Sequence, residues 1–252
     1  MRNQALGTML VGMVAFGGAH VQVQSRQHVA SVDGITGSRD ALAVLQQART
    51  ALGGQRRLLS VTSLLIAGTR TISDQLTEQF NYRLMLPDRF QHVTGPFTYT
   101  VDGAGYWQRP DPGTAIKEEA KPRLVARFAE QCLVFLLRAT PQTPLQAAVA
   151  PNPKPGNVNL LFSGPGGFSR LVEFDSTSLR PRAFVHDAPV TGGGLPNGTV
   201  MTRRVTWEGF QNVHGIWFPT RMTDTIRATA SIVFSSIRID EGIGVNDFTE
   251  PR

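Results

Sequence analysis

The stretch FNYRLMLPDRFQH, residues 80–92, decides the fold of this chain. Its first half alternates between apolar and polar residues, which is the two-residue period of a β-strand. The apolar side of that strand carries large residues: Phe80, Tyr82, Leu84 and Leu86. Pro87 and Asp88 then interrupt the alternation, which resumes with Phe90. The pattern predicts two antiparallel strands joined at a tight corner, with one face covered by large apolar side chains.

Two interpretations of this apolar face are open. It is either the half-buried side of an ordinary sheet that packs on a helix, or the wall of a cavity that receives a ligand. Both require the same alternation, so the residues themselves favour neither.

The two-residue period extends along most of the chain. We expect strands at about 61–72, 75–86, 88–94, 97–102 and 105–109, and again at 158–163, 168–175, 180–185, 199–209, 215–223 and 230–239. Short turn segments separate them, which indicates a meander of about eleven antiparallel strands.

Two helices interrupt this series. The first is predicted from Ser38, a good N-cap, to the stop at Gly53-Gly54. The second is predicted over residues 117–139, with Val125, Phe128, Cys132 and Phe135 on one apolar face. A proline-rich crossover follows at 140–157. The predicted class is α+β, a curved antiparallel half-barrel sheet with helices on its concave side.

The N-terminus is typical of an export signal. Arg2 precedes an apolar stretch at residues 5–16 that is too short to span a bilayer, and small residues at 17–19 predict cleavage near Ala19. We therefore expect a signal peptide at 1–19, a flexible lead-in at 20–37 and a single domain at 38–252. The mature protein would be soluble and periplasmic or secreted.

Composition and motifs exclude several functions. The net charge is +6, but the basic residues are spread along the chain, unlike those of a nucleic-acid binder. The single cysteine, Cys132, allows no internal disulfide. The sequence has no G-x-S-x-G, no H-E-x-x-H and no Cys/His spacing for zinc. His186-Asp187 is interpreted as part of a polar surface turn. We expect no enzyme activity, no metal and no cofactor, although a polar cluster around His186 or His214 would revive an enzyme hypothesis.

Several motifs in order resemble the periplasmic lipoprotein-carrier superfamily with the LolA/LolB-like fold. They are a P-x-x-F turn at Pro87 and Phe90, a D-G-x-x-x-W hairpin at Asp102, Gly103 and Trp107, a G-x-x-F-P motif at Gly215, Phe218 and Pro219, and a tail with Asp247, Phe248 and Pro251. The segment ARTALGGQRRLLSVTSLLIAGT also resembles the start of outer-membrane lipoprotein-sorting-like proteins. The resemblance covers about residues 40–252.

The resemblance implies an exported carrier that binds a lipid, an acyl chain or a lipoprotein in the cell envelope, with membrane lipoproteins or envelope proteins as further partners. The lipoprotein carrier has an arginine before the turn proline, linked to closing its cavity, whereas this chain has Leu86. That departure favours a broader apolar ligand. The alternative is an envelope sensor or protein-interaction module with the same fold. The expected ligand-binding residues are Phe80, Tyr82, Leu84, Leu86, Phe90, Phe97, Tyr99, Trp107, Val125, Phe128 and Phe135.

Overall fold

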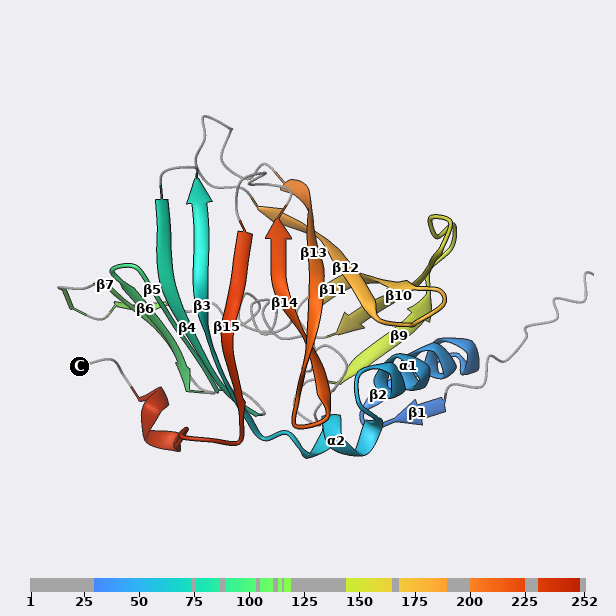
Figure 1. The fold of residues 1–252 in the computed structure, drawn as a ribbon, viewed down its shortest axis with the longest axis horizontal. Helices are drawn as coiled ribbons and strands as arrows, with labels where there is room; N and C mark the ends of the chain where they lie inside the picture. Colours follow the sequence, from blue (N-terminus) through green and yellow to red (C-terminus); the bar gives the residue numbers. More distant parts are fainter. Residues whose placement is uncertain are drawn as a thin grey trace, which may run out of the picture.

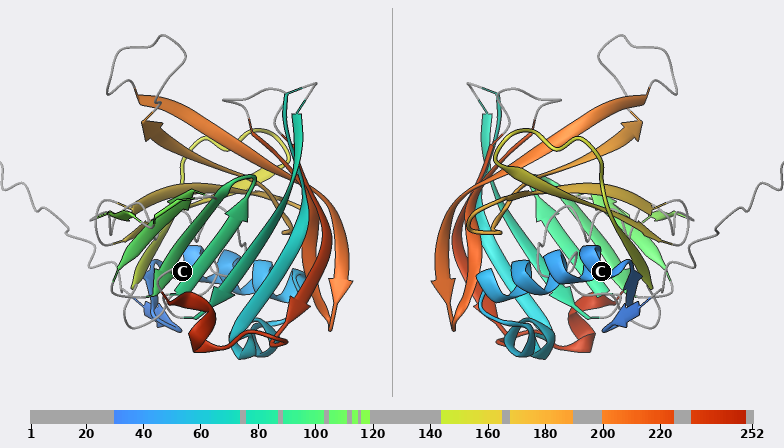
Figure 2. Two further views of the ribbon diagram at one scale, coloured as in Figure 1. Left: turned by 90° about the vertical axis from the view of Figure 1, so that its left-hand side faces the viewer. Right: turned by 90° about the vertical axis from the view of Figure 1, so that its right-hand side faces the viewer.

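The computed structural model describes residues 30–73, 76–86, 89–102, 105–110, 113–114, 116–118, 144–164, 168–189, 200–224 and 231–249. In these residues one sheet of fifteen strands curves around helix α1, as Figures 1 and 2 show. The expected large, mainly antiparallel sheet is confirmed, but the described architecture is mostly β, with more strands than the eleven expected.

Thirteen of these strands form two meanders that meet in the middle of the sheet. The first meander contains β3 (Ser63–Ser73), β4 (Leu76–Met85), β5 (Arg89–Thr94), β6 (Phe97–Asp102), β7 (Tyr106–Pro110) and β8 (Ile116–Glu118). The second contains β9 (Leu145–Val149), β10 (Asn157–Gly164), β11 (Phe168–Asp175), β12 (Pro181–Pro189), β13 (Val200–Val213), β14 (Ile216–Asp224) and β15 (Ser231–Ile239). Antiparallel pairing of β15 with β3 joins the two meanders.

The eleven predicted strands are present, and four short ones were missed. The missed strands are β1 (Ala30–Val32), β2 (Ile35–Gly37), β8 and β9. Each has five residues or fewer, too few for a two-residue period to stand out. The predicted second helix is corrected at its start, because Lys117 and Glu118 belong to β8. The remainder of that helix lies outside the described residues.

Helix α1 (Arg39–Ala51) forms as its sequence predicts. The Ser38 hydroxyl accepts a hydrogen bond from the Ala41 amide at 3.3 Å, which caps the first turn. The chain leaves the helix through Gly53 at φ +123°, a conformation that favours glycine. A Cβ at Gly53 would also lie 2.1 Å from the carbonyl oxygen of Gly215, so only glycine fits there. The short helix α2 (Gln55–Ser60) follows, and it was not predicted.

The expected flexible lead-in is wrong for its last eight residues. Ala30–Gly37 form a hairpin that turns at Asp33 and Gly34, and β2 pairs in parallel with β9. The Asp33 carboxylate accepts hydrogen bonds at 2.8 Å from Arg49, whose side chain is fully buried on α1, and from Gln55. This ion pair ties the hairpin to the helix. The Asp33-Gly34 turn between Val32 and Ile35 was a hairpin signal that sequence reasoning overlooked.

The expected proline-rich crossover is also corrected in part. Leu145–Val149 lie between its prolines and form β9, which pairs with β2 on one side and with β10 on the other. Helix α1 makes its main sheet contacts with β9, β1, β10 and β2. The buried stripe of α1 that faces them consists of Ala41, Leu42, Leu45 and Ala48.

The C-terminal segment returns across the other face of the sheet. Asp240 accepts hydrogen bonds from the Thr62 amide at 2.8 Å and the Ser63 amide at 2.7 Å. Burial raises the pKa of Asp240, but these bonds, with that from the Thr62 hydroxyl, outweigh burial and hold the pKa below its ordinary value. The 3₁₀ helix η2 (Val245–Phe248) then packs on β5 and β6, where Gln91 donates to the Asp247 carbonyl at 2.9 Å.

Candidate functional site

The face of the sheet that turns toward α1, called the inner face below, carries the opening stretch of the sequence. On β4 it holds Phe80, Tyr82 and Leu84, exposed by only 1%, 2% and 0%. The register pairs Leu84 with Phe90 and Tyr82 with His92 of β5, so these side chains share one face. The face predicted for Phe80, Tyr82, Leu84 and Phe90 is therefore the observed one. Their role in binding stays a prediction.

The same surface continues across β6 and β7 as a row of rings. The ring centroids of Tyr82 and His92 are 4.4 Å apart, those of His92 and Tyr99 5.8 Å, and those of Tyr99 and Tyr106 6.4 Å. We use the name aromatic row for these residues: Phe80, Tyr82, Phe90, His92, Phe97, Tyr99 and Tyr106. Its members are buried on β4, β5 and β7, but Phe97 on β6 is 36% exposed.

Trp107 is a correction to the expected site. It pairs with Thr100, whereas Tyr106 pairs with Val101, so Trp107 lies on the outer face, opposite the aromatic row. The cause is the tight turn before β7, where the Gly105 amide donates to Asp102 at 2.7 Å. This turn sets the parity of the strand so that Tyr106, not its neighbour, points inward.

The remaining expected site residues divide into two groups. Leu86 follows β4, is half-buried and packs against the hydrophobic core, and its amide donates to the Thr62 carbonyl at 2.9 Å. Val125, Phe128 and Phe135 lie outside the described residues.

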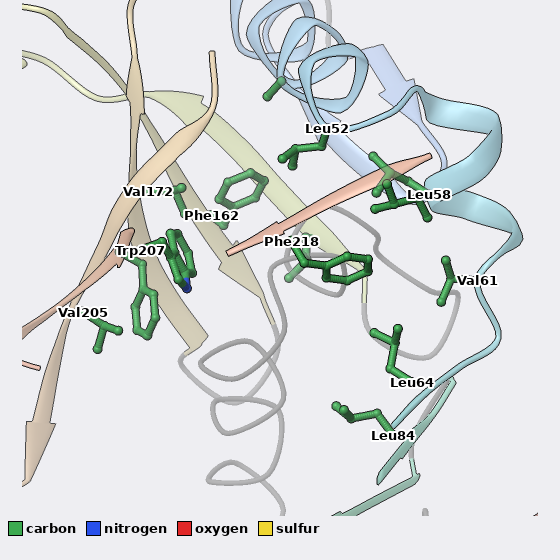
Figure 3. Close-up of a cluster of buried hydrophobic side chains, with 14 of the residues drawn as sticks. Leu52, Leu58, Val61, Leu64, Leu84, Phe162, Val172, Val205, Trp207 and Phe218 are labelled. Atoms are coloured by element: carbon green, nitrogen blue, oxygen red, sulfur yellow. The ribbon is translucent and has the colours of Figure 1, made fainter. Parts of the chain in front are cut away.

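Sequence reasoning missed the inner face of the second meander. Figure 3 shows a cluster of buried apolar side chains on this face. It contains Phe162, Val172, Val205, Trp207 and Phe218, together with leucines from the segment that includes α1 and α2. The Phe184 and Trp207 rings lie 5.2 Å apart. The alternation of apolar and polar residues in 168–175 indicated this buried face. The sequence analysis used that alternation to predict a strand, but not to predict a site.

The two meanders form one continuous apolar surface at the seam between β15 and β3. The Phe80 and Phe234 rings meet edge to face with centroids 6.0 Å apart. Gly68 on β3 makes this contact possible, because a Cβ there would lie 2.9 Å from the Phe80 ring and 2.1 Å from the Val233 carbonyl oxygen.

One edge of the inner face is polar. The described part of β11 to β14 contributes four side chains, which we call the polar row: Arg170, His186, Arg203 and Asp224. His186 pairs with Arg203 in the sheet, and Arg203 forms an ion pair with Asp224 at 2.6 Å. The expected surface position of His186 is wrong, because it is only 7% exposed and its ring stacks on Phe184 at 5.6 Å.

The polar row places an imidazole beside two guanidinium groups and one carboxylate. Among the described residues, no group of three or more His, Cys, Asp or Glu side chains could hold a metal ion. None of the described helices is long and apolar enough to cross a membrane.

Comparison with solved structures supports the fold. A DUF1329 family protein from Desulfovibrio piger matches with a TM-score of 0.51 and 11% identity over 82% of this chain and 96% of that one. A LolA superfamily protein from Nitrosomonas europaea matches with a TM-score of 0.48 and 15% identity over 83% and 97%. At 11% identity, the match to the DUF1329 family protein shows a likeness of fold alone. No family model and no curated protein matches the sequence.

Proposed function

We propose that the protein is an exported carrier that binds a lipid, an acyl chain or the acyl group of a lipoprotein on the inner face of its sheet. The observation that carries this proposal is the aromatic row, which crosses β4 to β7 and includes the partly exposed rings of Phe97 and Tyr99 on β6. The likeness of fold to the solved structures is consistent with it.

The position of α1 supports this assignment. Its main sheet contacts are with β9, β1, β10 and β2, at the opposite end of the sheet order from β4 to β7. The aromatic row is therefore a separate part of the inner face from the part on which this helix packs. A surface of this kind is suited to a ligand that is recognised by its apolar area.

Burial of apolar area is sufficient for the affinity of such a ligand. A sixteen-carbon chain contributes on the order of 10 kcal/mol at about 0.8 kcal/mol for each buried methylene, before the cost of ordering the chain is subtracted. The proposed function contains no chemical step and needs no cofactor.

Lipid that accompanies the purified protein tests the proposal. The full chain would be expressed with its export signal, purified without detergent and examined by native mass spectrometry. We expect a mass increment that organic extraction releases as a lipid. Protein without lipid, accompanied instead by a protein partner, would contradict the carrier and favour the interaction module.

A further inference from the structure

The outer face of the sheet carries two half-buried rings near the end of the β13–β14 hairpin. Phe218 of β14 points into the inner-face cluster, so its neighbour Trp217 points outward. Phe210 of β13 pairs with Pro219 and lies on the same outer face. The Arg180 guanidinium carbon lies 4.4 Å from the centre of the Trp217 ring and 5.6 Å from that of the Phe210 ring. A cation in this position is attracted by the faces of both rings.

Arg180 is a cation that no carboxylate of the described residues neutralises. Arginines nearby on the sheet are paired instead: Arg182 with Asp175, and Arg221 with Glu208. Within the part of the chain that the structure describes, the Arg180 guanidinium has no ion pair and no hydrogen bond. Its contacts with the rings use no acceptor oxygen, so its N–H donors remain for an anion.

A second cation lies at the end of the same hairpin. The chain turns at His214 and Gly215, both with positive φ, just before β14 reaches Trp217. A Cβ on Gly215 would lie 2.5 Å from an Nη atom of Arg57, so this guanidinium of α2 rests on the turn itself. The Trp217 amide donates to the Leu52 carbonyl at 2.9 Å, which holds the segment before α2 against β14. Arg57 is exposed, and it has no ion pair among the described residues.

We use the name basic–aromatic patch for Arg57, Arg180, Phe210 and Trp217. Figures 1 and 2 show that α2 and the β13–β14 turn lie at the lower edge of the sheet. A flat surface can approach residues at this edge without entering the concave inner face. The two rings of the patch lie on the opposite face of the sheet from the aromatic row.

We propose that the basic–aromatic patch docks on the anionic lipid head groups of a membrane surface. Lipid phosphate oxygens accept hydrogen bonds from Arg180 and Arg57, and Trp217 lies at the level of the head groups, where tryptophan is enriched in membrane proteins. The net charge of +6 favours approach to a negative surface. The inference goes beyond the proposed function and does not depend on it, because it uses a different face of the sheet.

The small apolar area of the patch favours a membrane over a protein as the partner. A stable protein interface buries about 1,000 Å² or more around an apolar centre, whereas the patch contributes two half-buried rings. Attraction to anionic lipids needs no such area, because each arginine near the surface raises the affinity about fivefold. Two such cations give a weak and reversible contact.

Arg39 supplies a matched control for this assignment. It is exposed and, like Arg57, forms no ion pair within the described part of the chain. Arg39 begins α1, whereas Leu52 at the other end of that helix contacts Trp217, so about 20 Å separate Arg39 from the patch. Charges at that distance are largely screened, because the Debye length is about 8 Å at physiological ionic strength. Arg39→Gln and Arg57→Gln therefore remove the same charge from two exposed arginines, one outside the patch and one within it.

The test measures binding of the purified protein to vesicles made of an equal mixture of phosphatidylethanolamine and phosphatidylglycerol, with phosphatidylcholine vesicles as the neutral reference. We expect the wild-type protein to bind the anionic vesicles about twentyfold more tightly, and to lose this preference at high salt. Arg57→Gln and Arg180→Gln should each weaken that binding about fivefold, whereas Arg39→Gln should leave it unchanged. Arg180→Lys keeps the charge and should retain most of the affinity, which a purely structural role of the stacked arginine would not predict.

Tryptophan fluorescence locates the contact on the protein. The three tryptophans of the chain are Trp107, Trp207 and Trp217. Trp207 is 4% exposed in the inner-face cluster, and Trp107 lies on the outer face of the first meander. Anionic vesicles whose acyl chains carry bromine should therefore quench the fluorescence of the wild-type protein, and Trp217→Phe should remove that quenching.

The possible outcomes decide the inference. Equal binding to anionic and neutral vesicles, equal losses in Arg39→Gln and Arg57→Gln, or quenching that persists in Trp217→Phe would overturn it. Binding to soluble polyglutamate but to no vesicle would also overturn it and would indicate an acidic protein partner. If Arg180→Gln does not fold, Arg57→Gln carries the test, because that side chain is exposed. The proposed function is tested separately by ligand binding on the inner face, so the failure of one leaves the other intact.

Discussion

The ion pair between Arg49 and Asp33 offers a sharp test of how the N-terminal hairpin is held. The Arg49 side chain is fully buried, whereas that of Asp33 is 32% exposed. Burial lowers the pKa of Arg49, and Asp33 opposes that shift by interacting with the cation. Asp33→Asn removes the charge but keeps a residue that tolerates the φ of +49° at this turn.

The expected cost of Asp33→Asn follows from the asymmetry of this pair. Removing the counter-charge of a buried cation typically lowers the free energy of unfolding by about 3–5 kcal/mol. Because Asp33 is partly exposed, we expect a loss of about 3 kcal/mol for Asp33→Asn. The double variant Asp33→Asn/Arg49→Met should recover most of that loss, because it no longer buries a charge.

Urea unfolding followed by circular dichroism measures both values. With a slope of about 2–3 kcal/mol per molar urea, Asp33→Asn should lower the midpoint by about 1 M. A loss below about 1 kcal/mol, or a double variant less stable than Asp33→Asn, would refute the reasoning that the pair compensates a buried charge.

Three further predictions follow from local geometry. Gly53→Ala should lower the free energy of unfolding, measured with urea, by about 3 kcal/mol or more, because the added Cβ meets the Gly215 carbonyl. Gly242→Ala should lower it by only about 1 kcal/mol, because this glycine has a φ of +65° but open space around it. Equal losses in the two variants would contradict the steric argument. Asp240→Asn should destabilise the protein at pH 7. Because the folded-state pKa of Asp240 is lowered, its carboxylate stabilises the fold at pH values above the unfolded-state pKa of about 3.9, and this stabilisation disappears as the pH falls through the folded-state pKa. The difference in free energy of unfolding between wild type and Asp240→Asn should therefore shrink at strongly acid pH. A difference that stays constant with pH would refute this prediction. N-terminal sequencing of the exported protein should begin near His20, and an intact Met1 would contradict export by a cleaved signal.

The predictable parts of the fold were those that repeat over many residues. The alternation through Phe80, Tyr82 and Leu84 determines a face, because a slip of one residue would expose all three. Ser38 marks the start of α1 because its hydroxyl caps the first turn, and Gly53 marks the end because glycine tolerates a positive φ. By contrast, β9 lies between prolines, and its pairing with β2 connects residues more than a hundred positions apart, a relation that no local pattern contains.

The candidate site was predictable only in part for similar reasons. Trp107 was assigned to the wrong face because the parity of β7 depends on the geometry of one turn. His186 was interpreted as a surface residue because a histidine next to an aspartate is usually exposed, yet pairing with Arg203 and stacking on Phe184 bury it. The polar row exists only after four strands are aligned, so it had no signature in the sequence.

Binding of a fluorescent fatty acid to Tyr99→Ala and Trp107→Ala tests the central claim most directly. Both residues are half-buried aromatics on neighbouring strands, but Tyr99 belongs to the aromatic row and Trp107 lies on the outer face. The carrier function predicts that Tyr99→Ala weakens binding about thirtyfold, because about 2 kcal/mol of apolar contact is lost, while Trp107→Ala leaves the affinity unchanged. Equal affinity in the two variants, or a larger loss in Trp107→Ala, would contradict binding on the inner face.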